Sequence, residues 1–554
     1  MKAAVFSLLI IAGSPSFLPA ETTWQVVDTG QDFCYDDSKP ITPPKAGGRY
    51  FGQDAQYAGA APAYKDNGDG TVTDLNTGLM WSKAVDPHKV GLVEAKGIAK
   101  DMTLGGHEDW RVPTIKELYS LIDFRGVTGM APNGDFFKQP ASSVPYINTD
   151  YFDFLYGDLK AGERFIDAQW LSDTPYTGKT MGGMETLFGV NFADGRIKGY
   201  GLRGQDGKGK KFYARYVRGP AYGQNDFADN GDGTVTDRAT GLIWTKEDSA
   251  KGMTWEEALR YAEGLTAGGQ EDWRLPNAKE LQSLVDYTRS PEATKSPAID
   301  PIFETTPITS EAGEKDWPYF WASTTHLDGP NALQAVYVAF GRAPGSLHGQ
   351  VMDVHGAGAQ RSDPKVGQPR IGFGPQGDAQ RSKNFVRCVR GGNVTFKENP
   401  TRAESDPSKY PNTIRVGGQA RKPQPIDFTR PAQAPGDSGG LPGQGPGGNQ
   451  MTGQTQAPGQ APGPGKPPGQ NPMPGMPGQM GDSKVMQSEF IKRHDRNGDG
   501  KVSRSEFPGP REHFKEFDKN KDNAITIDEA PTGPPPSGPG GQQSPGGPPQ
   551  GPPR

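Results

Sequence analysis

The chain is poor in the residues that build metal clusters and disulfide frameworks. Its 554 residues include only two cysteines and seven histidines. The histidines are scattered along the sequence, so no group of them has the spacing of a zinc site. The low cysteine count also excludes a small secreted fold held together by many disulfides.

Long apolar runs are absent after the first twenty residues. Lys2 precedes the run AAVFSLLIIAG, and Pro15 with several small residues leads to Ala20. This order is typical of a secretory signal peptide cleaved near Ala20, and the run is too short for a transmembrane anchor. We therefore expect a secreted, periplasmic or cell-surface protein. Because these compartments are oxidising, we predict a disulfide between Cys34 and Cys388, with two free thiols as the alternative.

A strong charge of one sign is also absent. The 60 basic and 65 acidic residues leave a formal net charge of −5 on the whole chain. This charge is too small to indicate a nucleic-acid partner or a membrane-surface partner. The composition instead predicts an ordinary soluble, multi-domain secreted protein.

What the chain does have is a long internal repeat. The segment DNGDGTVTDLNTGLMWSK begins at Asp66 and DNGDGTVTDRATGLIWTK begins at Asp229, an offset of 163 residues. The same offset aligns GGHEDWRVPTIKELYSLIDF with GGQEDWRLPNAKELQSLVDY. Alternation in TVTD and GLMW predicts hairpin strands, and apolar spacing predicts helices over residues 115–123 and 255–266. Each copy is therefore expected to be α+β and, with so long a period, to bury its own core.

These motifs resemble a known family. The opening DNGDGTVTD…TGLMW, the DWR[VL]P…KEL block and the closing VRG are similar to the Lcl-C family, the C-terminal domain of a collagen-like adhesin. The resemblance covers residues 61–220 and 223–392. It implies a C-type-lectin-like fold, shared with formylglycine-generating enzymes, and adhesion through sulfated glycans. It brings no catalytic residues with it.

Two motifs inside the repeat have competing interpretations. Trp110 and Arg111, with Trp273 and Arg274 in the second copy, have the chemistry to bind sugars or sulfate. We favour a structural role, with the indole in the core and the arginine tying loops together. The NGDG turns resemble calcium loops, but the residues at the required first and last positions cannot bind the ion. We therefore predict β-turns closed by their own Asp and Asn side chains.

Two further segments are candidates for function. Lys208, Lys210 and Lys211, with Arg215 nearby, form a basic cluster that would attract a polyanionic glycan; a merely solvated run of charge is the alternative and is favoured. Residues 436–440 spell GDSGG, the motif around a serine-protease nucleophile. That string lies in a stretch rich in proline and glycine, so we reject a catalytic role for Ser438.

The most specific motif lies near the C-terminus. Residues 495–506 spell DRNGDGKVSRSE and residues 518–529 spell DKNKDNAITIDE, so two twelve-residue loops resemble the EF-hand family. Position 6 is Gly500 in the first loop and Asn523 in the second, and asparagine is able to adopt the left-handed backbone that the turn needs. The predicted Ca²⁺ ligands are Asp495, Asn497, Asp499, Lys501 (carbonyl), Ser503 and Glu506, and Asp518, Asn520, Asp522, Ala524 (carbonyl), Thr526 and Glu529.

The sequence therefore predicts a modular secreted chain. We expect a signal peptide (1–20), a lead segment (21–60), two tandem C-type-lectin-like α+β domains (61–222 and 223–398), a disordered Pro/Gly/Gln-rich linker (399–481), a small α-helical EF-hand pair (482–531) and a disordered tail (532–554). The predicted function is non-enzymatic calcium binding combined with adhesion to an extracellular glycan or surface protein. A cell-envelope enzyme or enzyme accessory on the same scaffold is the alternative.

Overall fold

The computed structural model of the chain describes residues 22–130, 134–204, 207–329, 331–374 and 376–397, and further on residues 491, 495, 499–504, 506–507, 514–515 and 517–530. The chain divides into two compact units, Met1–Ser438 and Gly439–Arg554, and each is described by itself. The predicted signal peptide, linker and tail lie outside the described residues, as does Asn497. None of the helices in the described part is long and apolar enough to cross a membrane.

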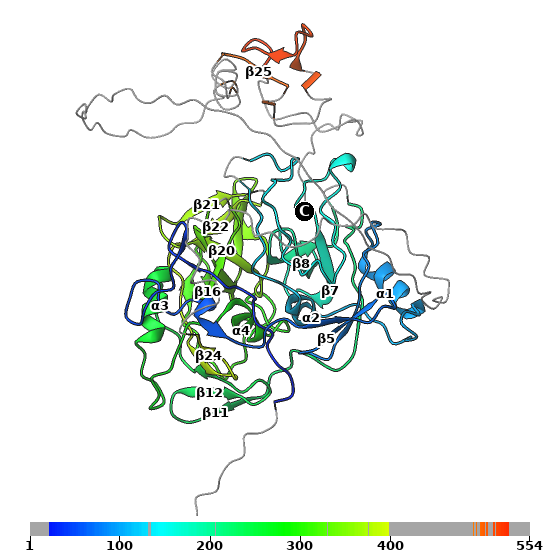
Figure 1. The fold of residues 1–554 in the computed structure, drawn as a ribbon. Helices are drawn as coiled ribbons and strands as arrows, with labels where there is room; N and C mark the ends of the chain where they lie inside the picture. Colours follow the sequence, from blue (N-terminus) through cyan, green and yellow to red (C-terminus); the bar gives the residue numbers. More distant parts are fainter. Residues whose placement is uncertain are drawn as a thin grey trace, which may run out of the picture. The chain divides into compact units, whose positions relative to one another are not determined.

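The first unit is built around a six-stranded antiparallel sheet to which each sequence copy contributes three strands (Figure 1). Its strands are β7 (Gln169–Pro175), β8 (Thr186–Asn191) and β9 (Arg196–Gly201) from the first copy, and β16 (Tyr319–His326), β17 (Gln334–Ala339) and β20 (Gln360–Pro364) from the second. Their order is β16-β17-β20-β9-β8-β7. The copies join where Gln360 of β20 lies opposite Ile197 of β9. This order is that of a pseudo-twofold axis between β9 and β20.

A four-stranded sheet in each copy contains the predicted hairpins. In the first copy it comprises β4 (Tyr64–Asp66), β5 (Thr71–Asp74), β6 (Met80–Ser82) and β10 (Val217–Arg218). In the second it comprises β11 (Phe227–Asp229), β12 (Thr234–Asp237), β13 (Leu242–Thr245) and β23 (Val389–Gly391). The closing strand pairs with the second hairpin strand in both copies. The opening and closing motifs of each copy therefore meet in one sheet.

Two of the helices in the described region, α2 (Ile115–Ser120) and α3 (Trp255–Glu263), begin where the sequence predicts. The others in this region are α1 (Leu92–Asp101) and α4 (Ala278–Ser283). Capping boxes start three of these helices, with Thr114, Thr254 or Asn277 bonded reciprocally to the glutamate three residues later. The prediction of helices within 115–123 and 255–266 is confirmed, although both end earlier, α2 at Ser120 and α3 before Gly264.

Short strands and turns complete the two units. They are β1 (Cys34–Tyr35), β2 (Pro40–Ile41), β3 (Tyr57–Ala58), β14 (Ile308–Thr309), β15 (Lys315–Asp316), β18 (Pro344–Leu347), β19 (Gln350–Asp353), β21 (Arg370–Phe373), β22 (Asp378–Gln380), β24 (Thr395–Phe396), β25 (Val502–Ser503) and β26 (Ala524–Ile525), with the 3₁₀ turns η1 (Asp54–Gln56) and η2 (Leu159–Ala161). Strands outnumber helices among the described residues, so this part of the chain is mostly β.

The apolar core is shared between the two copies. One buried cluster includes Trp81 and Trp170 of the first copy together with Trp244 and Phe320 of the second. Smaller clusters lie within each copy, around Trp110 in the first and Trp273 in the second. The prediction that each copy buries its own core therefore holds for the two smaller clusters and is wrong for the shared one. The reason is the β9–β20 pairing, which places the sheets of both copies over one interior.

Two lysines related by the repeat cross between the copies. Lys116 Nζ donates to the carbonyl oxygen of Ser283 at 2.7 Å, and Lys279 Nζ donates to that of Ser120 at 2.9 Å. The offset of 163 residues relates Lys116 to Lys279 and Ser120 to Ser283. Each lysine on one helix therefore bonds the end of the other helix, and α2 and α4 pack together (Figure 1). Such reciprocity is the property of an isologous twofold contact.

The repeated Trp-Arg pair is structural, as predicted. Trp110 and Trp273 are buried, and each indole N–H donates at 3.1 Å to two carbonyls of the preceding turn. Arg274 makes a bidentate ion pair with Glu280, both contacts at 2.6 Å. Arg111 pairs with Glu117 in the same way. Because each glutamate also caps its helix, the arginine ties the loop before the helix to the capping box.

The repeat offers a matched test of this ion pair. The side chain of Arg274 is 5% exposed, whereas that of Arg111 is 38% exposed. Arg274→Met leaves the Glu280 carboxylate buried and short of its partner, which we expect to lower the free energy of unfolding by about 3–5 kcal/mol. Arg111→Met should cost less, because water reaches Glu117 where the arginine was. Urea unfolding of the full chain, followed by tryptophan fluorescence, measures both. An equal or smaller loss for Arg274→Met would contradict this account.

Candidate functional site

The two predicted calcium loops are joined by a short antiparallel ladder. In it β25 pairs with β26, Val502 opposite Ile525 and Ser503 opposite Ala524. Val502 and Ile525 hold position 8 of their loops and are fully buried. They pack with Ile491, Phe514 and Ala530 in a small apolar cluster. The ladder therefore fixes one loop against the other and gives the second unit its core.

The sharp turn at position 6 has the backbone that the sequence predicts. Gly500 has a φ of 79°, and Asn523 has a φ of 65°. Both values lie in the left-handed region, which glycine enters freely and asparagine tolerates better than most residues. The departure from glycine in the second loop is therefore accommodated without changing the turn.

Backbone N–H groups orient the carboxylates of the first loop. Asp495 accepts hydrogen bonds from the N–H groups of Asp499 at 3.2 Å and Gly500 at 2.7 Å. Glu506 accepts from the N–H of Ser503 at 2.8 Å and from its hydroxyl at 2.6 Å. Position 1 is thus tied to positions 5 and 6, and position 12 is tied to position 9.

The second loop repeats this pattern and closes it further. Asp518 accepts from the N–H groups of Asp522 and Asn523 at 3.1 Å. Glu529 bonds Thr526 through one carboxylate oxygen, and with the other it accepts from the N–H groups of Lys519 and Asn520 at 3.1 Å. Burial opposes ionisation, but the hydrogen bonds led by Thr526 lower the pKa of Glu529 below its ordinary value. The carboxylate at position 12 is therefore charged and reaches across to positions 2 and 3.

The donor set of each loop fits a hard cation. Side-chain oxygens of Asp, Asn, Ser, Thr and Glu are the ligands that Ca²⁺ prefers, and no nitrogen or sulfur ligand is interposed. In the part of the chain that the structure describes, no group of three or more His, Cys, Asp or Glu converges on a metal-ligating point. The loop carboxylates instead bond N–H groups and hydroxyls of their own loops, as given above.

The NGDG turns of the first unit are β-turns, as predicted. Asp66 accepts from the N–H of Gly68 at 3.0 Å, and Asp69 accepts from the N–H of Thr71 at 3.0 Å and its hydroxyl at 2.6 Å. The second copy repeats these bonds at Asp229 and Asp232. The carboxylates accept hydrogen bonds from groups within the turn. The turns therefore resemble a calcium loop in sequence but not in structure.

Only two of the three lysines in the predicted basic cluster are exposed. Lys208 and Lys211 are exposed, and Lys211 lies 3.5 Å from Glu94. Lys210 is half-buried, with its ammonium over the rings of Tyr200 at 4.8 Å and Phe212 at 5.6 Å. Two exposed ammonium groups therefore remain at this surface.

Arg215 does not belong to that cluster, contrary to the prediction. It is fully buried, lies over the rings of Phe152 and Trp170, and donates to the carbonyls of Ser82, Lys83 and Asp153. Arg387 does the same in the second copy. Both arginines precede the closing VRG motif, a recurrence that the repeat alignment could have revealed.

The predicted disulfide between Cys34 and Cys388 is not formed. Both residues are buried free thiols. Cys34 is paired with Ile41 in the lead segment, whereas Cys388 packs in the core of the second copy. Burial raises the pKa of Cys34 to about 12 and also raises that of Cys388. Each sulfur is thus a neutral, inert core group, which is the alternative that the sequence left open.

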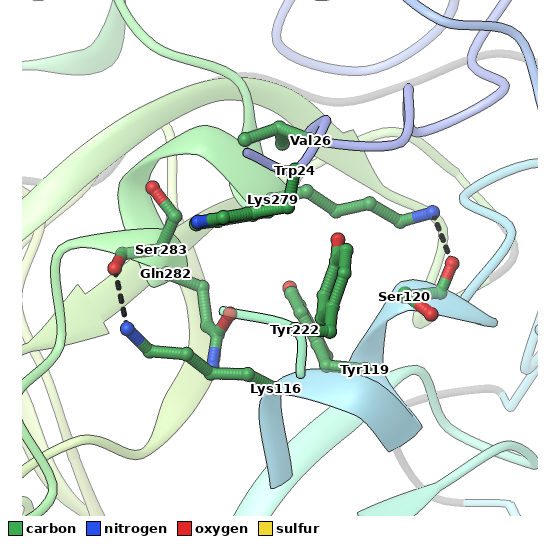
Figure 2. A pocket seen from close by; sticks show the side chains of 9 residues that line it. All are labelled: Trp24, Val26, Lys116, Tyr119, Ser120, Tyr222, Lys279, Gln282 and Ser283. Atoms are coloured by element: carbon green, nitrogen blue, oxygen red, sulfur yellow. Dashed lines mark hydrogen bonds between the residues drawn. The ribbon is translucent and has the colours of Figure 1, made fainter. Parts of the chain in front are cut away.

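The sequence did not predict a small cavity at the pseudo-twofold axis. Its volume is about 10 Å³, enough for one water-sized molecule. Trp24 and Tyr222 form an aromatic edge contact at 4.7 Å, and the Tyr119 hydroxyl is buried without a hydrogen-bond partner among the described residues. Figure 2 shows the lining side chains, which are those of Trp24, Val26, Lys116, Tyr119, Ser120, Tyr222, Lys279, Gln282 and Ser283.

Comparison with protein families gives one match. The family model described as the Lcl C-terminal domain matches residues 70–218 and 233–354. One segment lies within each copy of the repeat, which is consistent with tandem domains of this kind. No curated protein and no solved structure gave a match.

Proposed function

We propose that the protein is a secreted, non-enzymatic calcium-binding protein whose tandem Lcl C-terminal domains act as an adhesion module. The observation that carries the calcium assignment is the ladder that pairs Val502 with Ile525. It couples two twelve-residue loops whose sixth residues are both left-handed. An accidental pair of acidic turns has no reason to share such a ladder.

Calcium would replace the loops' internal hydrogen bonds as the partner of their carboxylates. Asp495, Asp499 and Glu506 in the first loop, with the Ser503 hydroxyl, supply oxygens that bond groups of their own loop. Asp518, Asp522, Thr526 and Glu529 do so in the second. Asn497 and Asn520 and the carbonyls of Lys501 and Ala524 complete the predicted sets.

The apolar core of the second unit is small, which makes metal binding important for its stability. Among the described residues of this unit, five buried ones form the cluster around the ladder. Closely spaced carboxylates repel one another without a cation, and a core of this size offsets little of that repulsion. The free energy of calcium binding is therefore expected to appear as folding free energy.

The adhesion module is proposed from the family match and from the first unit's surface. The ligand class is an extracellular glycan or surface protein. Lys208 and Lys211 present exposed ammonium groups on the loop after β9, which would attract sulfate or carboxylate groups of a polyanionic glycan. The buried tryptophans and arginines of the repeat hold the scaffold rather than the ligand.

Calorimetry with Ca²⁺ tests the metal assignment. We expect two ions per chain, with dissociation constants of roughly 10⁻⁴–10⁻³ M or tighter. Glu506→Gln and Glu529→Gln should each remove one site, since each loses the bidentate carboxylate at position 12. Asp528→Asn is the matched control, because Asp528 is an exposed acid at position 11 of the second loop and no predicted ligand. No calcium heat up to several millimolar, or equal loss in the control, would refute the assignment.

Heparin retention tests the glycan ligand separately. Replacing Lys208, Lys210 and Lys211 by Ala should lower the salt concentration needed for elution, because clustered ammonium groups are screened by salt. The control replaces the exposed lysines Lys138, Lys160 and Lys295 by Ala, which removes the same charge elsewhere. Equal elution of the two triple variants, or no retention of the unmodified protein at low salt, would argue against a polyanionic ligand at this surface.

A further inference from the structure

An amine, a carboxamide and a carboxylate are linked in sequence where the two copies meet. Lys116 Nζ, from α2 of the first copy, donates to Asn225 Oδ1 at 2.9 Å. Asn225 Nδ2 donates in turn to Asp237 Oδ2 at 2.9 Å. Asn225 lies just before β11 and Asp237 ends β12, both in the second copy. The three side chains thus form a continuous chain of polar contacts across the boundary between the copies.

The amine lies next to the amide carbon. A C=O bond is about 1.2 Å long, so Nζ lies within about 4 Å of Asn225 Cγ, near the separation at which bond formation begins. The lysine also donates to the carbonyl of Gly223 at 2.9 Å and to that of Ser283 at 2.7 Å, and both bonds restrain its direction. Figure 2 shows the bond to Ser283. Position and orientation are therefore both restrained.

The surroundings make the amine easier to deprotonate than an exposed lysine and hold the carboxylate in place. Lys116 lines the small cavity beside Trp24, Tyr119 and Tyr222. Burial lowers the pKa of Lys116 to about 8, although Asp237 opposes this shift. Asp237 is fully buried and is held by the N–H groups of Asp226 and Ala239 and by the Thr240 hydroxyl.

We propose that Lys116 and Asn225 join in an intramolecular isopeptide bond, with Asp237 as the proton-transfer group. The Lys116 nitrogen attacks Asn225 Cγ, an N–C bond forms, and the C=O π electrons move onto Oδ1. When the C=O bond re-forms, the Cγ–Nδ2 bond breaks. Asp237 takes a proton from the attacking nitrogen and passes it to Nδ2, which leaves as ammonia. An amine and an amide become a new amide and ammonia, so no oxidant or co-reactant is required.

The second copy supplies an internal control for this chemistry. Lys279, the repeat equivalent of Lys116, donates to two main-chain carbonyls, of Asp28 and Ser120, both at 2.9 Å. The position equivalent to Asn225 is Pro62, which has no carboxamide. Lys279 also donates to main-chain carbonyls outside its own copy but has no electrophile beside it. The arrangement at Lys116 is a departure from the repeat rather than a consequence of it.

The bond would lock the two copies together at their junction. It would tie α2 of the first copy to the segment that leads into β11 of the second, and so close a large covalent loop around the shared core. A cross-link of this kind restricts the unfolded chain most when the loop is long. It would give the tandem module resistance to unfolding without a disulfide.

Peptide mass analysis of the full-length protein tests the proposal. Trypsin does not cut after an acylated lysine, so we expect one branched species that joins residues 112–125 to residues 219–238. Its mass should equal the sum of the two peptides less one ammonia molecule. Fragmentation should place the link at Lys116 and Asn225. Linear 219–238 and cleavage after Lys116, as the main products from protein held at pH 8–9, would overturn the proposal.

Variants separate the roles of the three groups. Lys116→Arg should abolish the branched species, whereas Lys279→Arg should leave it intact. Asp237→Asn should reduce it strongly, because the amide cannot relay the proton. If Asp237→Asn does not fold, the mass of the unmodified protein still decides the question. A branched species that persists in Lys116→Arg would assign the link to another residue and also overturn the proposal.

Discussion

The pairing of β20 with β9 is the contact on which the rest of the first unit depends. It converts two copies of one sequence into a single six-stranded sheet. The sheet brings α2 and α4 together, and the reciprocal lysine bonds to Ser283 and Ser120 then become available. A shared interior follows, in which tryptophans of both copies pack in one cluster. The tandem arrangement therefore resembles a dimer formed within one chain more than two independently folded domains.

The second unit depends on a much smaller contact of the same kind. One two-residue ladder holds two predicted ligand loops in register, and five buried residues of the part that the structure describes pack around it. The difference in core size between the two units accounts for the different functions proposed for them. A large shared core suits a rigid module that presents a binding surface, whereas a minimal core suits a segment whose stability is set by an ion.

Local features of the fold could be predicted from the sequence, and contacts between the copies could not. Hairpin alternation, the capping box before Glu117 and the left-handed Asn523 follow from neighbouring residues. The shared core, the burial of Arg215 and the Lys116–Asn225 contact depend on segments far apart in the chain. No pattern in the sequence specifies the β9–β20 register that creates them. The disulfide prediction failed similarly, because a cysteine count gives no information about separation.

Hydrogen exchange along a urea series tests most directly whether the two copies are one cooperative unit. All nine tryptophans lie in residues 24–321, so fluorescence can report the global transition of the same unit alongside exchange. The account predicts that amides of β8 and β9 lose protection at the same urea concentration as amides of β17 and β20, and together with the fluorescence change. Loss of protection in one copy while the other stays protected would contradict it.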